Sequence, residues 1–429
     1  MNITRRRFVQ AAAAATAAFL PTFHGGGTSR LLAAGTGTTS RSAESLASDE
    51  DFWFEIQSAY EIDRSLSNLN NGAVSPSPRV VMDALHHYLN YVNLAPVRNQ
   101  GDLEQEAETI RRRLAANFGC TPGELAFTRN TTESLMNAEL GLDLKSGDEV
   151  LTTEQDYPRM IWAYQQRQKR DGIVLKMIPF PTPPPSMDYL VDMFERAITP
   201  RTRVIHFCHM TCYTGQIFPV KKICDMARSR GITTIVDGAH AFAHLPFKLK
   251  DLGCDYYGTS LHKWLCAPIG TGFLYVNKDR LPGLWPLMAA PGGMDGNIRK
   301  LEQIGTNPDS IRAGISEALT FHEGIGVERK SARLRYLKDR WARRLSQNPR
   351  VKLLTSLDPE QSCGLATFTV EGIESGKLMN YLWQKHQIIV APMSAQDFQG
   401  IRVAPNVYTT VDEIDAFSSA VEGALRTGI

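Results

Sequence analysis

The sequence predicts an α/β fold in which a large domain with a doubly wound, mainly parallel sheet precedes a smaller C-terminal α+β domain. From Ser67 to Ile311, short runs rich in β-branched residues alternate with helical patterns. Such alternation is typical of parallel strands joined by helices. Over the last hundred or so residues the pattern changes to long helices and separate strands. We therefore expect a large domain over residues 67–318 and a small domain over residues 319–429.

Five runs of the large domain are predicted strands: EVLTTEQ, IVLKMIPF, RVIHFCHM, TTIVDGAH and GTGFLYV. They are largely apolar on both faces, which is typical of parallel strands that helices cover from each side. Between two of them, the segment FPVKKICDMARSRG has Pro219 at a favourable first helical position and Gly231 as a stop signal. This order of strand, helix and strand indicates the doubly wound sheet.

The small domain begins with one or two amphipathic helices that carry arginine on the polar face, SEALTFHEGIGVERKSARLRYLKDRWARRLSQ. Three strands are predicted after it: GLATFTVEGI, IIVAPM and GIRVAP. A final helix, TTVDEIDAFSSAVEGAL, opens with Thr409 and Thr410 as capping residues. These elements make up the α+β module.

The composition is that of an ordinary globular protein. Of the 429 residues, 43% are hydrophobic and 21% are charged. A net charge of +2 is far from the strongly basic charge typical of nucleic-acid-binding proteins, so we expect no nucleic-acid partner. The seven cysteines include no CxxC pair and no zinc spacing, which argues against a metal site and against a disulfide framework.

The N-terminus predicts export. The segment TRRRFVQ precedes AAAAATAAFLPTF, a weakly apolar stretch that is too short to span a bilayer. Paired arginines followed by Phe8 resemble a twin-arginine signal, with cleavage after Ala33 or Ala34. We expect residues 1–34 to be this signal, read by the twin-arginine translocase, with a periplasmic or secreted product and no stable membrane insertion after cleavage. The alternative is a disordered basic tail.

Residues 35–66 follow as a polar linker and an N-terminal helical segment, DFWFEIQSAYEI.

Lys263 stands in apolar surroundings, in the segment DYYGTSLHKWLCAPIGTGFLYV. A lysine in a site of low polarity has a lowered pKa and forms Schiff bases with aldehydes. The alternative is a solvated lysine at the end of a strand.

Asp237 ends a predicted buried strand in IVDGAHAF, and His240 follows three residues later. Ligands of open α/β sheets bind at such strand ends. A carboxylate there favours the protonated form of a ring nitrogen on a ligand. The alternatives are a helix cap for Asp237 and a buried structural histidine for His240.

A phosphate site is predicted where Asn130, Thr131 and Thr132 precede a helix in FTRNTTESLMNAELGL. Free amides at a helix N-terminus, together with hydroxyl groups, bind anions. Ser260 and His262 in SLHK add two further donors. Simple helix capping by Asn130 is compatible with this interpretation.

Together, Asp237, His240, Ser260, His262 and Lys263, followed by a glycine-flanked strand, resemble the class V aminotransferase family of fold-type-I pyridoxal-phosphate enzymes. That family includes the cysteine desulfurases and the isopenicillin N epimerase-like proteins. The resemblance extends from about Ser67 to the C-terminus. It implies that pyridoxal 5'-phosphate is the cofactor and that Lys263 binds its aldehyde.

The resemblance also implies roles for the other residues. Asp237 pairs with the pyridine nitrogen, His240 lies near the ring hydroxyl and Tyr157 stacks on the ring. Thr131, Thr132, Ser260 and His262 bind the phosphate. Thr306, in IGTNP, reaches the phosphate of a neighbouring subunit and so implies a homodimer. Arg402, in GIRVAP, clamps the substrate carboxylate through its bidentate guanidinium.

The sequence also departs from the cysteine desulfurases. They carry a nucleophilic cysteine on a loop before the last strand, whereas this region reads APMSAQDFQGIR here. In HMTCYTG, Thr211 and Cys212 stand where desulfurases have an asparagine, and we interpret Cys212 as a packing residue.

The sequence thus predicts an exported enzyme that acts on an amino group next to a carboxylate, with aminotransferase or epimerase-like chemistry. Its substrate would be a small molecule or a peptide-linked amino acid, the latter by analogy with exported relatives that modify secreted peptides. The alternatives are a carbon–sulfur lyase related to the desulfurases and a non-catalytic binding protein on the same fold.

Overall fold

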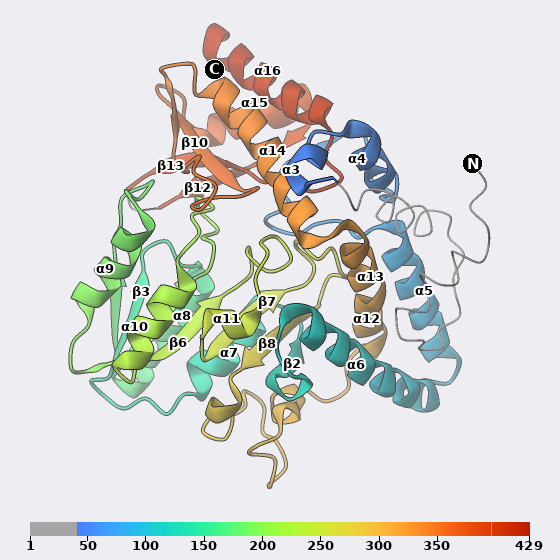
Figure 1. Cartoon of the computed structure of the whole chain (residues 1–429), viewed down its shortest axis with the longest axis vertical. Coiled ribbons are helices and arrows are strands. Elements are labelled where there is room, and N and C mark those ends of the chain that lie inside the picture. The colour runs from blue at the N-terminus through green and yellow to red at the C-terminus, as the bar shows by residue number, and fades with distance from the viewer. Residues whose placement is uncertain (1–40, 396) are drawn as a thin grey trace.

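The computed structural model of the protein describes residues 41–395 and 397–429 (Figure 1). The predicted signal peptide, residues 1–34, lies outside the described residues. Within the described part of the chain, no helix is long and apolar enough to cross a membrane.

A seven-stranded sheet forms the centre of the large domain, in the order β2-β8-β7-β6-β5-β3-β4. Its strands are β2 (Leu125–Thr128), β3 (Glu149–Thr153), β4 (Val174–Ile178), β5 (Thr202–Cys208), β6 (Thr233–Asp237), β7 (Tyr256–Ser260) and β8 (Gly272–Val276). The pairs from β4 through β3, β5 and β6 to β7 are all parallel. The predicted mainly parallel sheet is therefore confirmed.

Strand β8 differs from the expected parallel direction, because it runs antiparallel to both of its neighbours, β7 and β2. Only residues 261–271 join β7 to β8. A parallel crossover usually needs a dozen or more residues and a helix, so this shorter connection turns the chain back beside β7. The connection carries Lys263, which the reversal places at the carboxyl end of β7.

Helices cover both faces of the sheet. These are α7 (Thr131–Gly141), α8 (Pro158–Asp171), α9 (Met187–Ala197), α10 (Val220–Ser229) and α11 (Leu249–Leu252). Successive strand residues belong to different cores: Val204 and Ile235 lie in the cluster with α7 and α8, whereas Ile205 and Val236 lie in the cluster with α9 and α10. This alternation explains why the strands are apolar on both faces.

A second group of helices packs beside the sheet (Figure 1). It consists of α5 (Arg79–Leu94), α6 (Pro96–Phe118), α12 (Asp309–Ala313) and α13 (Ile315–Ile325). Short elements lie before and between these helices: α3 (Ala43–Leu46), α4 (Glu50–Gln57), β1 (Ser67–Asn68) and the 3-10 turns η1 (Pro122–Glu124), η2 (Lys278–Arg280) and η3 (Ile298–Glu302).

The C-terminal part has its own antiparallel sheet in the order β12-β13-β10-β9. Its elements are α14 (Val327–Leu345), β9 (Val351–Leu353), β10 (Ala366–Val370), α15 (Ser375–His386), β11 (Ile388–Ile389), β12 (Ala391–Ser394), β13 (Gln399–Val403) and α16 (Val411–Thr427). The long amphipathic pattern is two helices, because the chain turns at Gly326 with a positive φ of 83°. Thr410 and Glu413 form a capping box at the start of α16.

The segment after β1 connects the two sheets. Strand β1 pairs with β11, and Asn70 bridges to Ala404 just after β13. Leu69 is fully buried in the core of the C-terminal part, whereas Ala73 lines a pocket at the large sheet. A segment of a few residues thus ties the position of β13 to that pocket.

Candidate active site

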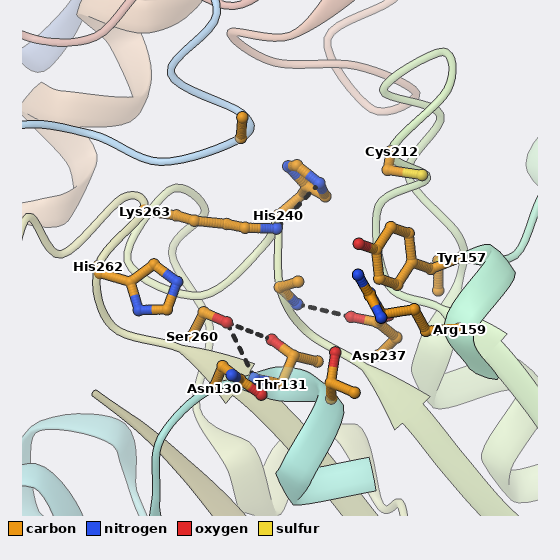
Figure 2. Close-up of a pocket in the computed structure, with 14 residues that line it drawn as sticks. Asn130, Thr131, Tyr157, Arg159, Cys212, Asp237, His240, Ser260, His262 and Lys263 are labelled. Atoms are coloured by element: carbon orange, nitrogen blue, oxygen red, sulfur yellow. Dashed lines mark hydrogen bonds between the residues drawn. The ribbon is translucent and has the colours of Figure 1, made fainter. Parts of the chain in front are cut away.

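A pocket with a cavity volume of about 340 Å³ lies at the carboxyl ends of β5, β6 and β7 (Figure 2). Eight residues predicted from the sequence line it together: Thr131, Thr132, Tyr157, Asp237, His240, Ser260, His262 and Lys263. It is also lined by Ala73, Asn130, Arg159, Cys208, Cys212 and Ala239. The parallel sheet explains this convergence, because the carboxyl ends of its strands meet at one edge.

The start of α7 forms the anion-binding side of the pocket. The side chain of Asn130 accepts a hydrogen bond from the amide of Glu133 at 2.9 Å and so caps the helix. Ser260 Oγ accepts from the Thr131 amide at 2.9 Å and lies 2.7 Å from Thr131 Oγ1. These contacts fix two hydroxyl groups at the positive end of the α7 dipole, where a phosphate group is stabilised.

Two structural features fix the position of the residues on the anion-binding side of the pocket. His262 Nδ1 lies 3.1 Å from the carbonyl oxygen of Thr271, which orients the imidazole at the pocket wall. At Gly272, a β-carbon would lie 2.6 Å from the carbonyl oxygen of Thr259 and 2.8 Å from Asn130 Cα. Only glycine therefore lets β8 approach the first residues of α7 so closely.

Asp237 is a buried carboxylate at the end of β6, with 3% of its surface exposed. One of its oxygens accepts a hydrogen bond from the Ala239 amide at 2.9 Å. Burial raises the pKa of Asp237 to about 6, although the Ala239 hydrogen bond and the charge of Lys263 oppose this. No arginine or lysine among the described residues forms an ion pair with it within 4.0 Å. A carboxylate in this position is suited to a cationic ligand group.

Lys263 points into the pocket from the connection between β7 and β8, and its Nζ lies 3.4 Å from His240 Nε2 (Figure 2). Burial lowers the pKa of Lys263, and the charge of Arg402 lowers it further, whereas Asp237 acts in the opposite direction. Burial also holds the pKa of His240 well below its usual range. Lys263 is thus favoured as a neutral nucleophile next to a neutral imidazole.

Arg402 adjoins the pocket from β13. Its guanidinium donates to the carbonyl oxygen of Cys212 at 2.9 Å and to Asn70 Oδ1 at 2.8 Å. At Gly72, a β-carbon would lie 3.2 Å from Arg402 Cζ and 3.3 Å from His240 Cε1. Glycine at this position therefore keeps Arg402 next to the imidazole that contacts Lys263.

Arg402 also differs from the other buried arginines of the described chain. Arg111, Arg167 and Arg333 each pair with a carboxylate: Glu302, Asp171 and Glu50, respectively. Arg402 is only 5% exposed, yet its partners in the described chain are neutral oxygens and its Nε has no hydrogen-bond partner there. A buried guanidinium without a carboxylate is an expected binding site for a ligand carboxylate.

Tyr157 and Cys212 lie on the wall of the pocket beside Arg402. Tyr157 is the residue before α8, and 38% of its surface is exposed. The sequence favoured a packing role for Cys212, and the structure adds that this residue also faces the cavity. Burial raises the pKa of the Cys212 thiol to about 11, so the thiol is protonated near neutral pH.

Of the predicted site residues, Arg402 adjoins this pocket without lining it, and Thr306 is also not among the lining residues. It is exposed, in the connection between η3 and α12. Its predicted contact with a neighbouring subunit stays a prediction.

Sequence reasoning missed Ala73, Arg159, Cys208 and Ala239 as pocket residues. For Arg159 a signal was present, since it stands two residues after Tyr157 in the first turn of a helix that follows a predicted strand.

A desolvated lysine, a buried carboxylate and a helix N-terminus at one sheet edge fit the aldehyde, the pyridine nitrogen and the phosphate of pyridoxal 5'-phosphate. These features and the fold define a fold-type-I pyridoxal-phosphate enzyme. Residues 67–417 match the family "Aminotransferase class-V". The chain therefore belongs to the class V aminotransferase family, and pyridoxal 5'-phosphate is its cofactor.

The chain is similar to proteins of more than one activity. The chain is 31% identical to an isopenicillin N epimerase of Streptomyces clavuligerus, over 86% of this chain and 98% of that protein. It is 27% identical to a probable cysteine desulfurase of Mycolicibacterium paratuberculosis, over 84% of this chain and 56% of that protein. A solved structure of the cystine C-S lyase C-DES has a TM-score of 0.74 at 25% identity, over 83% and 97% of the two chains.

Ionisation of the buried Asp237 should lower the stability of the cofactor-free protein as the pH rises. Its pKa is raised from 3.8 to about 6, so the folded state holds this proton more tightly than the unfolded chain. Above about pH 6 the ionised carboxylate destabilises the fold by on the order of 3 kcal/mol. Asp237→Asn should raise the melting temperature of cofactor-free protein at about pH 8.

The difference between Asp237→Asn and the unchanged protein should shrink as the pH falls below about 6 and be smallest below 3.8, where Asp237 is mostly protonated in both the folded and the unfolded state. Both proteins contain the same buried histidines, so comparing them at each pH cancels the contribution of histidine titration to the melting temperature. A melting difference of the same size at both ends of this pH range would show that desolvation of Asp237 is not its cause.

Proposed function

We propose that this protein acts on the amino group of an amino acid whose neighbouring carboxylate binds Arg402, with aminotransferase or epimerase-like chemistry. The observation that carries the proposal is the buried, carboxylate-free Arg402, which Gly72 keeps beside His240 near Lys263 Nζ. A carboxylate bound to Arg402 would hold the adjacent amino group close to the lysine amine.

The bound cofactor supplies an acceptor for the electron pair that the substrate Cα–H bond leaves behind. Lys263 Nζ then takes the proton from Cα, since its lowered pKa suits a general base. Asp237 maintains a positive charge on the ring side, and Arg402 fixes the orientation of Cα through the carboxylate. Supply of a proton to the opposite face of Cα, by a group other than Lys263, would give epimerisation, whereas supply of a proton on the cofactor side would give transamination.

The second candidate function is cleavage of a carbon–sulfur bond, which the desulfurase relatives and the C-S lyase structure favour. Two features weigh against a persulfide mechanism. The segment from Ala391 to Arg402 contains no cysteine. Cys212, which lines the pocket, has a thiol pKa of about 11 and is a poor nucleophile near neutral pH. A lyase reaction without a nucleophilic cysteine remains the alternative outcome of the same first step.

A non-catalytic binding protein is the candidate from another class. The desolvated Lys263, together with Asp237 and the α7 phosphate site, favours a catalyst over this candidate, because simple ligand binding does not require a nucleophilic amine.

We also propose a homodimer. The support is the predicted role of Thr306 together with the exposed apolar side chains of Leu94 and Val97, which are 81% and 92% exposed where α5 meets α6. Helix α12, which follows the Thr306 loop, packs against both of these helices. A monomeric mass for the cofactor-loaded protein in sedimentation equilibrium would contradict this proposal.

Arg402→Ala should damage substrate binding more than cofactor binding. A buried guanidinium–carboxylate pair contributes two charge-assisted hydrogen bonds, so its loss should weaken amino-acid binding by about 2–5 kcal/mol. Arg402→Lys should recover little, because an ammonium cannot form the bidentate pair. The measurement is the change in cofactor absorbance during titration with an active amino acid. Unchanged affinity in a cofactor-loaded Arg402→Ala variant would place the carboxylate elsewhere.

Export is proposed on the N-terminal sequence alone, since residues 1–34 lie outside the described residues. Replacing both Arg5 and Arg6 by lysine keeps the charge but removes the arginine pair that the translocase recognises. The precursor should then stay in the cytoplasm, as judged by fractionation and immunoblotting. Undiminished periplasmic accumulation of the double variant would rule out the twin-arginine route.

A further inference from the structure

Arg159 is a cation of the pocket that the proposed reaction does not use. It is exposed, lies in the first turn of α8 and lines the cavity with Tyr157 (Figure 2). Within the described chain no carboxylate lies within 4.0 Å of its guanidinium. The guanidinium lies over the ring of Trp162, whose centroid is 5.8 Å from Arg159 Cζ. The charge therefore remains available to a ligand.

The position of Arg159 in the first turn of α8 favours a bound anion. A helix N-terminus carries a partial positive charge, and a cation there is destabilising. The first turn of α8 contains no acidic residue that would offset this charge. At the other end of α8, by contrast, Arg170 pairs with Asp171. An anion bound beside Arg159 would relieve the repulsion and interact with both the guanidinium and the helix dipole.

The other charged groups of the pocket already have partners in the proposed complex. In the proposed complex, the start of α7 and Ser260 bind the cofactor phosphate, and Asp237 pairs with the ring nitrogen. Arg402 serves the substrate carboxylate. In the view of Figure 2, the Ser260–Thr131 pair and Arg159 are seen on either side of Asp237. The group that remains for Arg159 is the side chain of the substrate.

Resting on the proposed function, we infer that Arg159 selects substrates with a second anionic group on the side chain, as in dicarboxylic amino acids. The first carboxylate binds the buried Arg402, and the side-chain carboxylate binds the exposed Arg159 with the support of the α8 dipole. The aromatic ring of Tyr157 lines the same cavity as Arg159. An amide in place of the second carboxylate forfeits the charge-assisted hydrogen bond but keeps the shape.

The test compares each acid with its uncharged isostere: L-glutamate with L-glutamine, and L-aspartate with L-asparagine. The cofactor-loaded protein is titrated with each, and the change in cofactor absorbance gives the apparent dissociation constant. The unchanged protein should bind the better acid about tenfold more tightly than its amide, as expected for one charge-assisted hydrogen bond to a partly solvated guanidinium. Arg159→Gln should remove this preference, and Arg159→Glu should reverse it in favour of L-lysine or L-ornithine.

Two control variants address the alternative explanations. Arg170→Gln removes a similar charge from the far end of α8, and Trp162→Ala removes the ring under Arg159; both should keep the preference. The inference is overturned if Arg159→Gln binds the acid and the amide with the same ratio as the unchanged protein. Equal weakening of both ligands leaves this ratio unchanged, so it too overturns the inference and would indicate a contact with the cofactor. A cofactor-loaded protein that responds to no amino acid would overturn the proposed function as well.

Discussion

A buried carboxylate and a half-buried amine at one edge of a sheet are the constraint on which the rest of this structure depends. Asp237 and Lys263 shift each other's pKa, yet burial dominates both and disfavours each charge. Arg402 adds a third buried charge without a carboxylate among the described residues. Such groups are costly in a protein interior unless a ligand compensates them. The cofactor and a substrate carboxylate are the ligands that match these charges.

The scaffold brings these groups together through a few backbone features. The short connection after β7 reverses the chain and presents Lys263 at the strand end. Gly272 lets β8 contact the start of α7, and Gly72 lets Arg402 approach His240. The segment from β1 to Ala73 pairs with the C-terminal part and then enters the pocket. Movement of β13 relative to the large sheet would therefore act directly on substrate orientation.

Much of the site follows from the sequence, because strand ends and helix starts have local signals. Asp237 and Thr131 were predicted in this way, and the apolar strands predicted the covered sheet. The reversed direction of β8 was not predicted, since strand composition does not encode direction when both faces are buried. Arg159 was missed because the residues that follow it, Met160 and Ile161, are apolar and buried and carry no sign of a binding site. Its position after Tyr157 was a weak local signal, but only the fold shows that Arg159 lines the same pocket as Asp237.

The most direct test of the account is the covalent attachment of the cofactor. Cofactor-loaded protein is reduced with borohydride, digested, and searched by mass spectrometry for the modified lysine, in parallel with its absorbance spectrum. We predict that the adduct lies on Lys263 and that Lys263→Ala, folded by circular dichroism, shows neither the adduct nor the absorbance band of bound cofactor. Persistence of both in Lys263→Ala, with the adduct on another lysine, would contradict the central claim.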